Sequence, residues 1–341
     1  MQRTTVLLLF GGESSEHDVS ISSARNVYAA MDDSKYDITL CFIDKHGKWW
    51  LLNDFGMSVS THDAPQVVPV LGSGCFITVP SSHMIKPDVI LPVLHGKNGE
   101  DGSVQGLAQL LHIPIVGCDM TASALCMDKL AAKQILQTNG IAVVDYVVHK
   151  KVDPAPNFEA ITAQLTPPLF VKPSRAGSSV GVSKVQTPDE LAAALELAHQ
   201  HDDVALIEHG VIGREVEVAV LGNPPHHRAS RVGEIVADGE FYSYDSKYSS
   251  TSGSQIVIPA VIDEAIEQHI RDTALKVFAL LGCRGLARVD FFLLEDGTVY
   301  LNEVNTLPGF TNISMYPKLW REAGIPYPQL IDKLIAAALA K

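Results

Sequence analysis

The chain has 341 residues and a formal net charge of −13, with 39 acidic against 26 basic residues. Hydrophobic residues make up 46% of it and charged residues 19%, which is enough apolar material for two or three domains with their own cores. So acidic a chain is poorly suited to bind nucleic acid or an anionic membrane, and we expect neither as a partner. A locally positive pocket inside the acidic shell is still compatible with this balance.

The cysteines and the N-terminus indicate the compartment. Five cysteines are widely spaced without a CxxC pair, which predicts reduced thiols, with no disulfide framework and no zinc knuckle. The N-terminal "MQRTTVLLLFGG" contains an apolar run too short for a secretory core, and no run reaches the length of a membrane span. We therefore expect a cytoplasmic protein.

Residues 1–117 show a strand–helix alternation that predicts an open α/β domain. The apolar run "TVLLLF" stops at two glycines and is typical of a buried parallel strand. Further elements are expected as a helix at 20–31, strands at 36–43 and 88–96, and a helix at 101–113. Glu100 and Asp101 are expected to cap that last helix.

The remaining two thirds contain more strands. We expect one helix at 121–140, strands at 142–149, 168–173, 181–185 and 203–210, and a helix at 188–201. The part from about residue 208 is strand-rich, with helices expected at 263–282 and 327–340. The stretch "SKYSSTSGSQ" has no clear pattern and predicts a long mobile loop, placed at 240–256.

The stretch "FVKPSRAGSSVGVSKV" at 170–185 allows two interpretations. The chain has neither a GxxxxGK[ST] motif nor a GxGxxG after its first strand, so the common nucleotide loops are missing. A Gly/Ser segment between strands is usually a plain connection. However, Lys172 ends an apolar strand, where an ammonium needs an anionic partner, and small residues leave backbone N–H groups free to face a phosphate. This stretch alone favours the two interpretations equally.

The stretch "LARVDFFLLEDGTVYLNEVN" predicts a hairpin that turns at Asp296-Gly297. A two-residue turn would place Asp290 opposite Glu303 and Arg288 opposite Asn305, with all four on one face. Two facing carboxylates repel each other, and a divalent cation with oxygen ligands, Mg²⁺ or Mn²⁺, would relieve this. The alternative is a patch in which Arg288 neutralises the acids; the amide of Asn305 makes us favour the metal.

Together, seven stretches resemble the D-alanine–D-alanine ligases, a family of the ATP-grasp superfamily. They occur in the order "FGGESSEHDVS", "LHGKNGEDG", "ASALCMDK", "VKPSRAGSSVGVSKV", "FYSYDSKY", "ARVDFF" and "NEVNTLPGFT", and the resemblance covers essentially the whole chain. It implies an ATP-grasp fold, α/β and α+β, in three domains: a substrate-binding domain at 1–117, a central domain with the Gly/Ser loop at 118–207, and a C-terminal domain with the metal site at 208–341.

The resemblance also implies an activity. ATP would phosphorylate a first D-alanine to an acyl phosphate, and the amine of a second D-alanine would attack it, yielding a dipeptide for peptidoglycan synthesis in the cell wall. A homodimer through the first domain is implied as well. The alternatives are a D-alanine–D-serine ligase or another carboxylate–amine ligase, and, from a different class, a nucleotide-binding regulator without catalysis. Because the residues implied for catalysis are present, we disfavour the regulator.

The implied site residues fall into three groups. The ATP site would comprise Lys129, Lys172, Ser178, Ser179, Glu208, His209, Val211, Glu215, Phe241, Lys247, Phe292 and Asn302. Two Mg²⁺ or Mn²⁺ ions would be held by Asp290, Glu303 and Asn305, with Glu303 bridging. The substrate and catalytic residues would be Glu16, His95, Ser178, Lys247, Tyr248, Arg288, Gly309 and Ser314.

Within the third group the resemblance gives each residue a role. Arg288 and the backbone N–H of Gly309 would stabilise the oxyanion of the tetrahedral intermediate, while Lys247 and Ser314 would bind a substrate carboxylate. Glu16 would hold the ammonium of the first D-alanine and connect through Ser178 to Tyr248, closing the loop. A tyrosine at 248 resembles the dipeptide-forming members. From the residues alone, Glu16 could simply cap a helix and His95 could be a core histidine. Ala176 departs from the family pattern, with little expected effect.

Overall fold

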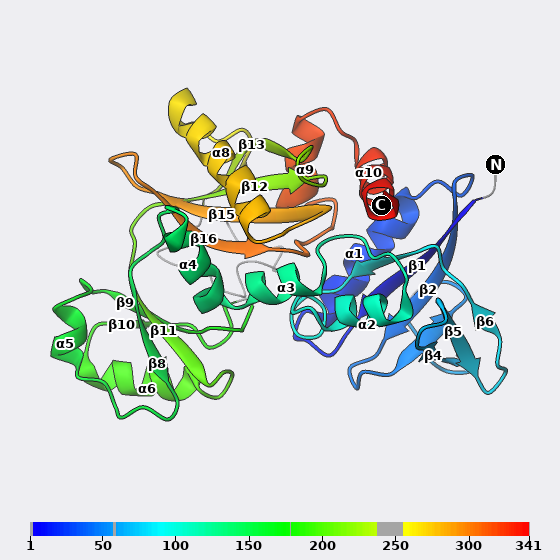
Figure 1. Ribbon diagram of the computed structural model, residues 1–341, viewed down its shortest axis with the longest axis horizontal. Helices are drawn as coiled ribbons and strands as arrows, with labels where there is room; N and C mark the ends of the chain where they lie inside the picture. Colours follow the sequence, from blue (N-terminus) through cyan, green and yellow to red (C-terminus); the bar gives the residue numbers. More distant parts are fainter. Residues whose placement is uncertain (1–2, 57–58, 178, 237–254, 341) are drawn as a thin grey trace.

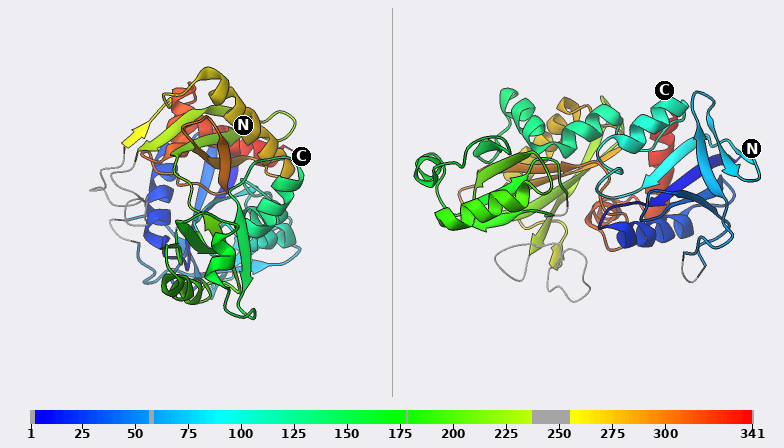
Figure 2. Two further views of the ribbon diagram at one scale, coloured as in Figure 1. Left: turned by 90° about the vertical axis from the view of Figure 1, so that its left-hand side faces the viewer. Right: turned by 90° about the horizontal axis from the view of Figure 1, so that it is seen from below.

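The computed structural model describes residues 3–56, 59–177, 179–236 and 255–340. Three sheets carry the architecture, and each draws its strands from a different part of the chain. Figures 1 and 2 show them arranged along the long axis of the molecule. The fold is a mixed α/β structure with several sheets, as the sequence predicts.

The first sheet has seven strands in the order β6-β5-β4-β3-β2-β1-β7. The parallel part, β1 (Thr4–Gly11), β2 (Tyr36–Ile43) and β7 (Val89–Val93), confirms the predicted strands. Alternate side chains of β1 pack on opposite faces, so α1 (His17–Ala30) covers one face and α2 (Ser103–Leu111) the other. An antiparallel extension, which the sequence did not reveal, comprises β3 (Trp49–Leu52), β4 (Gln66–Val70), β5 (Cys75–Val79) and β6 (Met84–Ile85).

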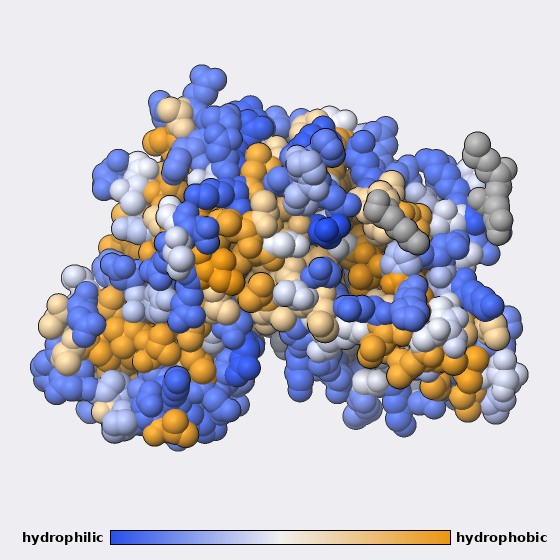
Figure 3. Space-filling view, viewed as in Figure 1, coloured by the Kyte–Doolittle hydropathy of each residue, from blue (hydrophilic) through white to orange (hydrophobic). Residues whose placement is uncertain are grey.

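The second sheet is antiparallel, with the order β10-β9-β11-β8. Its strands are β8 (Tyr146–Lys150), β9 (Leu169–Pro173), β10 (Ser183–Val185) and β11 (Val204–His209). The helices α5 (Phe158–Thr162) and α6 (Pro188–Ala198) pack on it and build a small separate core. The space-filling view shows a notch between this lobe and the part of the molecule built on the first sheet (Figure 3).

The third sheet is antiparallel too, with the order β14-β13-β12-β15-β16. Its strands are β12 (Arg214–Leu221), β13 (Arg228–Val236), β14 (Gln255–Val257), β15 (Leu286–Leu293) and β16 (Val299–Asn305). The helix α8 (Glu264–Leu280) packs on one face against alternate valines of β12, and α9 (Met315–Glu322) packs on the other. The short α9 was not predicted.

The helix expected at 121–140 is wrong, because the structure has two helices there. The first, α3, spans Met120–Met127, and the second, α4, spans Lys129–Thr138. Asp128 between them has φ −84° and ψ 96°, and its carboxylate accepts a hydrogen bond from the backbone of Ala131 as the N-cap of α4. Good helix formers on both sides of Asp128 hide this break in the sequence.

The predicted two-residue turn at Asp296-Gly297 is also wrong, yet the predicted pairing at the site is confirmed. The loop has three residues, since the N–H of Leu294 bonds to the carbonyl of Thr298. This shifts the register by one residue, and a β-bulge at Asn302 shifts it back. Asp290 therefore faces Glu303 and Arg288 faces Asn305 after all.

The C-terminal helices complete the core of the first sheet. The last helix, α10 (Tyr327–Leu339), shares one cluster of buried residues with α1, β1 and α9. Its Asp332 binds the ammonium of Lys35 at 2.7 Å and the hydroxyl of Tyr36 at 2.7 Å. The last helix is thus attached to the first sheet and lies beside α1 (Figure 1). No helix of the described segments is long and apolar enough to span a membrane.

We predict that Gly285→Ala destabilises the protein far more than Gly282→Ala. Both glycines have positive φ, +68° and +72°, so both alanines incur a backbone cost of about 1–2 kcal/mol. A Cβ on Gly285 would also lie 3.0 Å from the backbone nitrogen of Gly117, whereas nothing lies within 4 Å at Gly282. Urea unfolding of both variants measures the difference; equal losses would contradict the close approach of these segments.

Candidate active site

The predicted metal-binding strands carry a compact group of opposite charges. Arg288 on β15 donates two hydrogen bonds to Asp290, at 2.8 and 2.7 Å, and its Nε lies 3.0 Å from a carboxylate oxygen of Glu217 on β12. Burial alone would lower the pKa of Arg288, but Asp290 and Glu217 outweigh it and raise that pKa well above its usual value. The ion-pair interpretation of Arg288 and Asp290 is therefore confirmed.

The same pair of strands offers oxygen ligands suited to a divalent cation. Glu303 lies directly opposite Asp290, and the side-chain oxygen of Asn305 accepts a hydrogen bond from Leu307 at 3.1 Å. Two carboxylates and an amide oxygen form the donor set that Mg²⁺ prefers. Within the described ranges no group of three His, Cys, Asp or Glu side chains is arranged to hold a metal ion.

A second charged group lies on the second sheet and α4. Glu208 on β11 is 3% exposed, and its oxygens lie 2.7 Å from the ammonium of Lys172 on β9 and 3.1 Å from that of Lys133. Burial opposes ionisation of Glu208, but the two lysines outweigh it and lower its pKa. Burial lowers the pKa of Lys133 even though Glu208 opposes this change. The anionic partner expected for Lys172 is thus Glu208.

The Gly/Ser loop begins next to these groups. The ammonium of Lys129, the first residue of α4, donates to the carbonyl of Ala176 at 2.6 Å and lies 3.9 Å from Glu303. Ser179 has a left-handed backbone with φ +58°. A Cβ on Gly177 would lie 3.8 Å from the carboxylate of Glu100, which belongs to the first third of the chain. The loop therefore lies close to residues from the first third of the chain (Glu100), from α4 (Lys129) and from the third sheet (Glu303).

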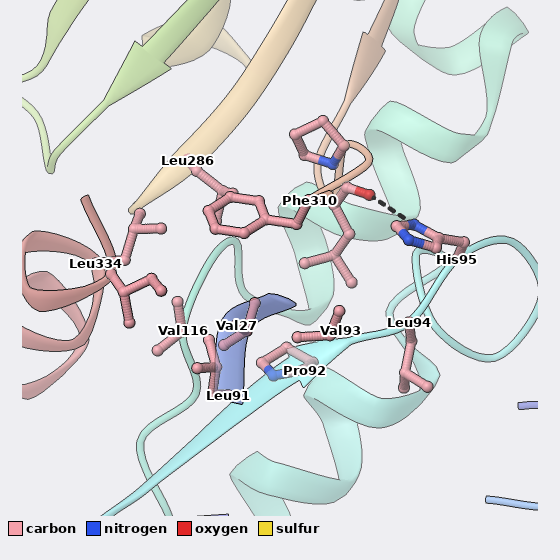
Figure 4. Close-up of a pocket in the computed structure, with 13 residues that line it drawn as sticks. Val27, Leu91, Pro92, Val93, Leu94, His95, Val116, Leu286, Phe310 and Leu334 are labelled. Atoms are coloured by element: carbon pink, nitrogen blue, oxygen red, sulfur yellow. Dashed lines mark hydrogen bonds between the residues drawn. The ribbon is translucent and has the colours of Figure 1, made fainter. Parts of the chain in front are cut away.

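On the side of the first sheet, His95 connects two parts of the chain. Its Nδ1 lies 3.1 Å from the carbonyl of Leu307 (Figure 4). Both residues line a small apolar cavity of about 20 Å³. Burial would lower the pKa of His95, but the carboxylates of Glu100 and Glu16 raise it. Burial, with a contribution from Glu16, raises the pKa of Glu100. A carboxylate oxygen of Glu100 lies 3.8 Å from Nδ1 of His95, so Glu100 does not cap α2 as expected, whereas Asp101 accepts a hydrogen bond at 3.0 Å from the N–H of Ser103, the first residue of α2.

Glu16 and the loop after β16 supply the remaining groups on this side. Glu16 is 5% exposed and is the N-cap residue of α1, as its place at a helix start predicts, but its side chain makes no capping hydrogen bond to the helix. Ser314 precedes α9, and its hydroxyl bonds to the backbone N–H of Thr311 at 3.1 Å. A Cβ on Gly309 would lie 3.0 Å from that hydroxyl, so a larger residue there would require Ser314 to shift.

The residues expected around adenine lie near the junction of β11 and β12. Nδ1 of His209 lies 2.6 Å from the carbonyl of Thr166, and Val211 is partly buried just before β12. Glu215 on β12 pairs directly with Phe292 on β15. Asn302 is the bulged residue of β16. Apart from Val211, which lies in the link between β11 and β12, these residues lie on strands of the second and third sheets.

Four predicted residues, Ser178, Phe241, Lys247 and Tyr248, lie outside the described residues, as does most of the loop at 240–256. Sequence reasoning missed Lys133, Glu217 and Glu100, which contact the predicted residues. Lys133 follows Lys129 by one helical turn, which places both on one face of the helix, and Glu217 alternates with apolar residues on its strand. These spacings weakly indicate that both residues face the site. The partner of each could not be read from the sequence.

Comparisons with known proteins agree along the whole chain. Models of families described as the D-ala D-ala ligase N-terminus and C-terminus match residues 5–118 and 135–336. The chain is 47% identical to D-alanine–D-alanine ligase A of Chromobacterium violaceum, covering 100% of this chain and 96% of that one. It is 46% identical to the D-alanine–D-alanine ligase of Sodalis glossinidius, covering 98% and 95%.

Solved structures give the same result. The D-alanine–D-alanine ligase from Coxiella burnetii superposes with a TM-score of 0.89 at 34% identity, covering 99% of this chain and 94% of that one. The VanG D-Ala:D-Ser ligase from Enterococcus faecalis superposes with a TM-score of 0.89 at 39% identity, covering 99% and 100%.

We predict that Glu208→Gln destabilises the protein in a pH-dependent manner. At neutral pH the loss should be about 3–5 kcal/mol, because two buried ammonium groups lose their counter-charge. The folded pKa of Glu208 is lowered, so its contribution is present above the ordinary glutamate pKa and is lost as pH falls through the folded value. Urea unfolding between pH 3 and 8 should show the difference from wild type shrinking towards acid.

The matched control is Glu234→Gln. Glu234 binds Arg214 at 2.6 Å, but the arginine side chain is 40% exposed, so we expect a loss of about 1 kcal/mol or less. A difference between wild type and Glu208→Gln that stays constant down to pH 3 would contradict the buried ion-pair network.

Proposed function

The chain belongs to the D-alanine–D-alanine ligase family, and we propose that it joins two molecules of D-alanine, with ATP converted to ADP and phosphate. One observation carries this proposal: Asp290 and Glu303 face each other on β15 and β16, between the catalytic candidate Arg288 and the lysine-bearing Gly/Ser loop. Family membership shows the ATP dependence. In the family's biological context, the dipeptide would serve peptidoglycan synthesis.

The chemistry requires this kind of site. A carboxylate is a poor electrophile, so it is first converted to an acyl phosphate that an amine can attack. Phosphoryl transfer depends mostly on positioning and on neutralising charge. Lys129 and Lys172 supply positive charge beside the Gly/Ser loop, and both already neutralise carboxylates of this protein, Glu303 and Glu208. We propose that phosphates of ATP take over part of these contacts.

Asp290, Glu303 and Asn305 would hold Mg²⁺ or Mn²⁺. The oxygen donors fit this assignment, and Arg288 would then share Asp290 with the metal. When bound, the ion would neutralise negative charge on the transferred phosphoryl group. We propose two such ions, with Glu303 as a ligand that both share.

Other residues would orient the amino acids. The buried Glu16 would bind the ammonium of the first D-alanine, with His95 beside it. Arg288 and the backbone N–H of Gly309 would stabilise the oxyanion of the tetrahedral intermediate as its charge develops. Ser314 would bind a substrate carboxylate. Closure over these groups would keep water from the acyl phosphate.

The proposal has further parts that rest on family resemblance. The ATP site would include Ser179, Glu208, His209, Val211, Glu215, Phe292 and Asn302, together with Ser178, Phe241 and Lys247. Tyr248 would close the loop through Ser178 and Glu16. The domains would span 1–117, 118–207 and 208–341. The protein would be a cytoplasmic homodimer that uses its first domain as the interface.

A D-alanine–D-serine ligase is the second candidate. One observation favours it: the structure named VanG D-Ala:D-Ser ligase is 39% identical and covers nearly the whole chain. The identities of 46% and 47% to ligases named for D-alanine alone make D-alanine the preferred second substrate.

Phosphate release tests the choice directly. With ATP and Mg²⁺, D-alanine alone should support release, whereas L-alanine should not. D-serine or D-lactate added to D-alanine should change neither the rate nor the main product, as mass spectrometry would show. No release with D-alanine would reject the proposed function, and release only after addition of D-serine would select the second candidate.

We predict that Arg288→Met retains ATP binding and loses turnover. The arginine would act on charge that develops in the transition state, so kcat should fall by about 10²-fold or more, while the Kd for ATP changes by only a few fold. Calorimetric titration and phosphate release measure the two quantities. An equal loss of ATP affinity would show that Arg288 only maintains the structure around Asp290 and Glu217.

A further inference from the structure

The short segment that enters the Gly/Ser loop is held by hydrogen bonds on two sides. This segment, residues 174–176 and called here the loop stem, connects the end of β9 with Gly177. The hydroxyl of Ser174 donates to the carboxylate of Asp128 at 2.7 Å, and the N–H of Leu130 donates to that hydroxyl at 3.1 Å. The N–H of Lys129 bonds to the carbonyl of Ser174 at 3.0 Å. The break between α3 and α4 thus gives the stem an anchor on one side.

A second anchor lies in the turn between α6 and β11. The carboxylate of Asp202 accepts three hydrogen bonds from Arg175: from the backbone nitrogen at 2.7 Å, from Nε at 3.1 Å and from a terminal nitrogen at 2.6 Å. It accepts a fourth from the backbone of Val204 at 3.2 Å. Burial opposes the charge on Asp202, but these donors outweigh burial and lower its pKa.

The same turn also contacts the far end of the Gly/Ser loop. Gly181 has φ +71°, and a Cβ there would lie only 2.8 Å from a ring carbon of His201. The imidazole of His201 therefore packs against Gly181 while Asp202 holds Arg175. One turn thus contacts the segment before the loop and the glycine near its end, which limits the positions that the loop can take.

The exposure of the two partners shows what this ion pair does for the fold. The Arg175 side chain is 54% exposed, whereas the side chain of Asp202 is 2% exposed. Because the guanidinium is half in water, the pair contributes little apolar packing and a modest stabilisation. Its geometric effect is larger, because one carboxylate fixes both the backbone and the side chain of the residue that opens the loop.

We propose that Asp202 is a positioning residue of the ligase reaction: it acts through Arg175 to hold the Gly/Ser loop in place for the phosphates of ATP. The inference rests on the proposed function, in which this loop contacts ATP. Asp202 is buried and anionic, so it does not touch the phosphates itself. Nucleotides with phosphates should depend on it, and the nucleoside should not.

The test compares two variants, Asp202→Asn and Arg175→Met, with two matched controls. Arg231 and Glu267 form the same two-point contact, at 2.5 and 2.8 Å, with side chains 44% and 10% exposed. They connect β13 with α8 and do not contact the loop stem. Arg231→Met and Glu267→Gln therefore remove an equivalent ion pair elsewhere in the fold.

Affinities for ADP with Mg²⁺ and for adenosine are measured by calorimetry on the full-length protein, with urea unfolding alongside. For Asp202→Asn and Arg175→Met we expect the Kd for ADP and the KM for ATP to rise about tenfold, which corresponds to about 1.4 kcal/mol. The Kd for adenosine should stay within twofold of wild type. Both controls should lose similar stability and keep their ADP affinity.

Three results would overturn the inference. The first is unchanged ADP affinity in Asp202→Asn, and the second is an equal loss of adenosine affinity, which would indicate a general distortion. The third is weaker ADP binding in Arg175→Met together with tighter binding in Asp202→Asn, because Arg175 would then contact the phosphates directly. Absence of ADP and ATP binding in the wild-type protein would instead reject the proposed function.

Discussion

The site depends on placing two facing carboxylates within a largely apolar sheet. Asp290 and Glu303 repel each other across β15 and β16, and the protein offsets this with cations on both sides: Arg288 within the sheet and Lys129 from α4. Glu217 extends the arrangement to β12. The charge of Glu303 is therefore balanced by Lys129 only when α4 lies against the third sheet. The charge balance of the site thus depends on how α4 and the sheets are arranged.

The parallel strands of the first sheet and the pairing of the two carboxylates could be predicted from the sequence. Continuous apolar runs identify the parallel strands of the first sheet, since such strands are buried on both faces. The pairing of Asp290 with Glu303 was also predicted, but through two errors that cancel: the turn has one residue more than expected, and the bulge at Asn302 restores the register. Period-two alternation reveals which residues share a face and does not reveal bulges.

The rest depends on contacts between distant segments. The break at Asp128 has no signal in local helix propensity, and its second role as a partner of Ser174 arises only when α4 meets β9. Similarly, Lys133 has the appearance of an ordinary helix residue until folding buries it against Glu208. The antiparallel strands between residues 49 and 85 are only two to five residues long, and each is ordered by its neighbour: β3 pairs with β2, β4 with β3, β5 with β4 and β6 with β5.

The core shared by α1, β1, α9 and α10 sets an order of events during translation. During synthesis β1 is made well before α9 and α10, whose side chains between Met315 and Ile335 complete the core on its α1 face. The lobe of the second sheet has a core made only from residues 147–207 and can fold as soon as it emerges. Until α9 and α10 have been made, the first sheet therefore exposes part of its apolar face to solvent. A chain released before that point would keep this apolar surface exposed.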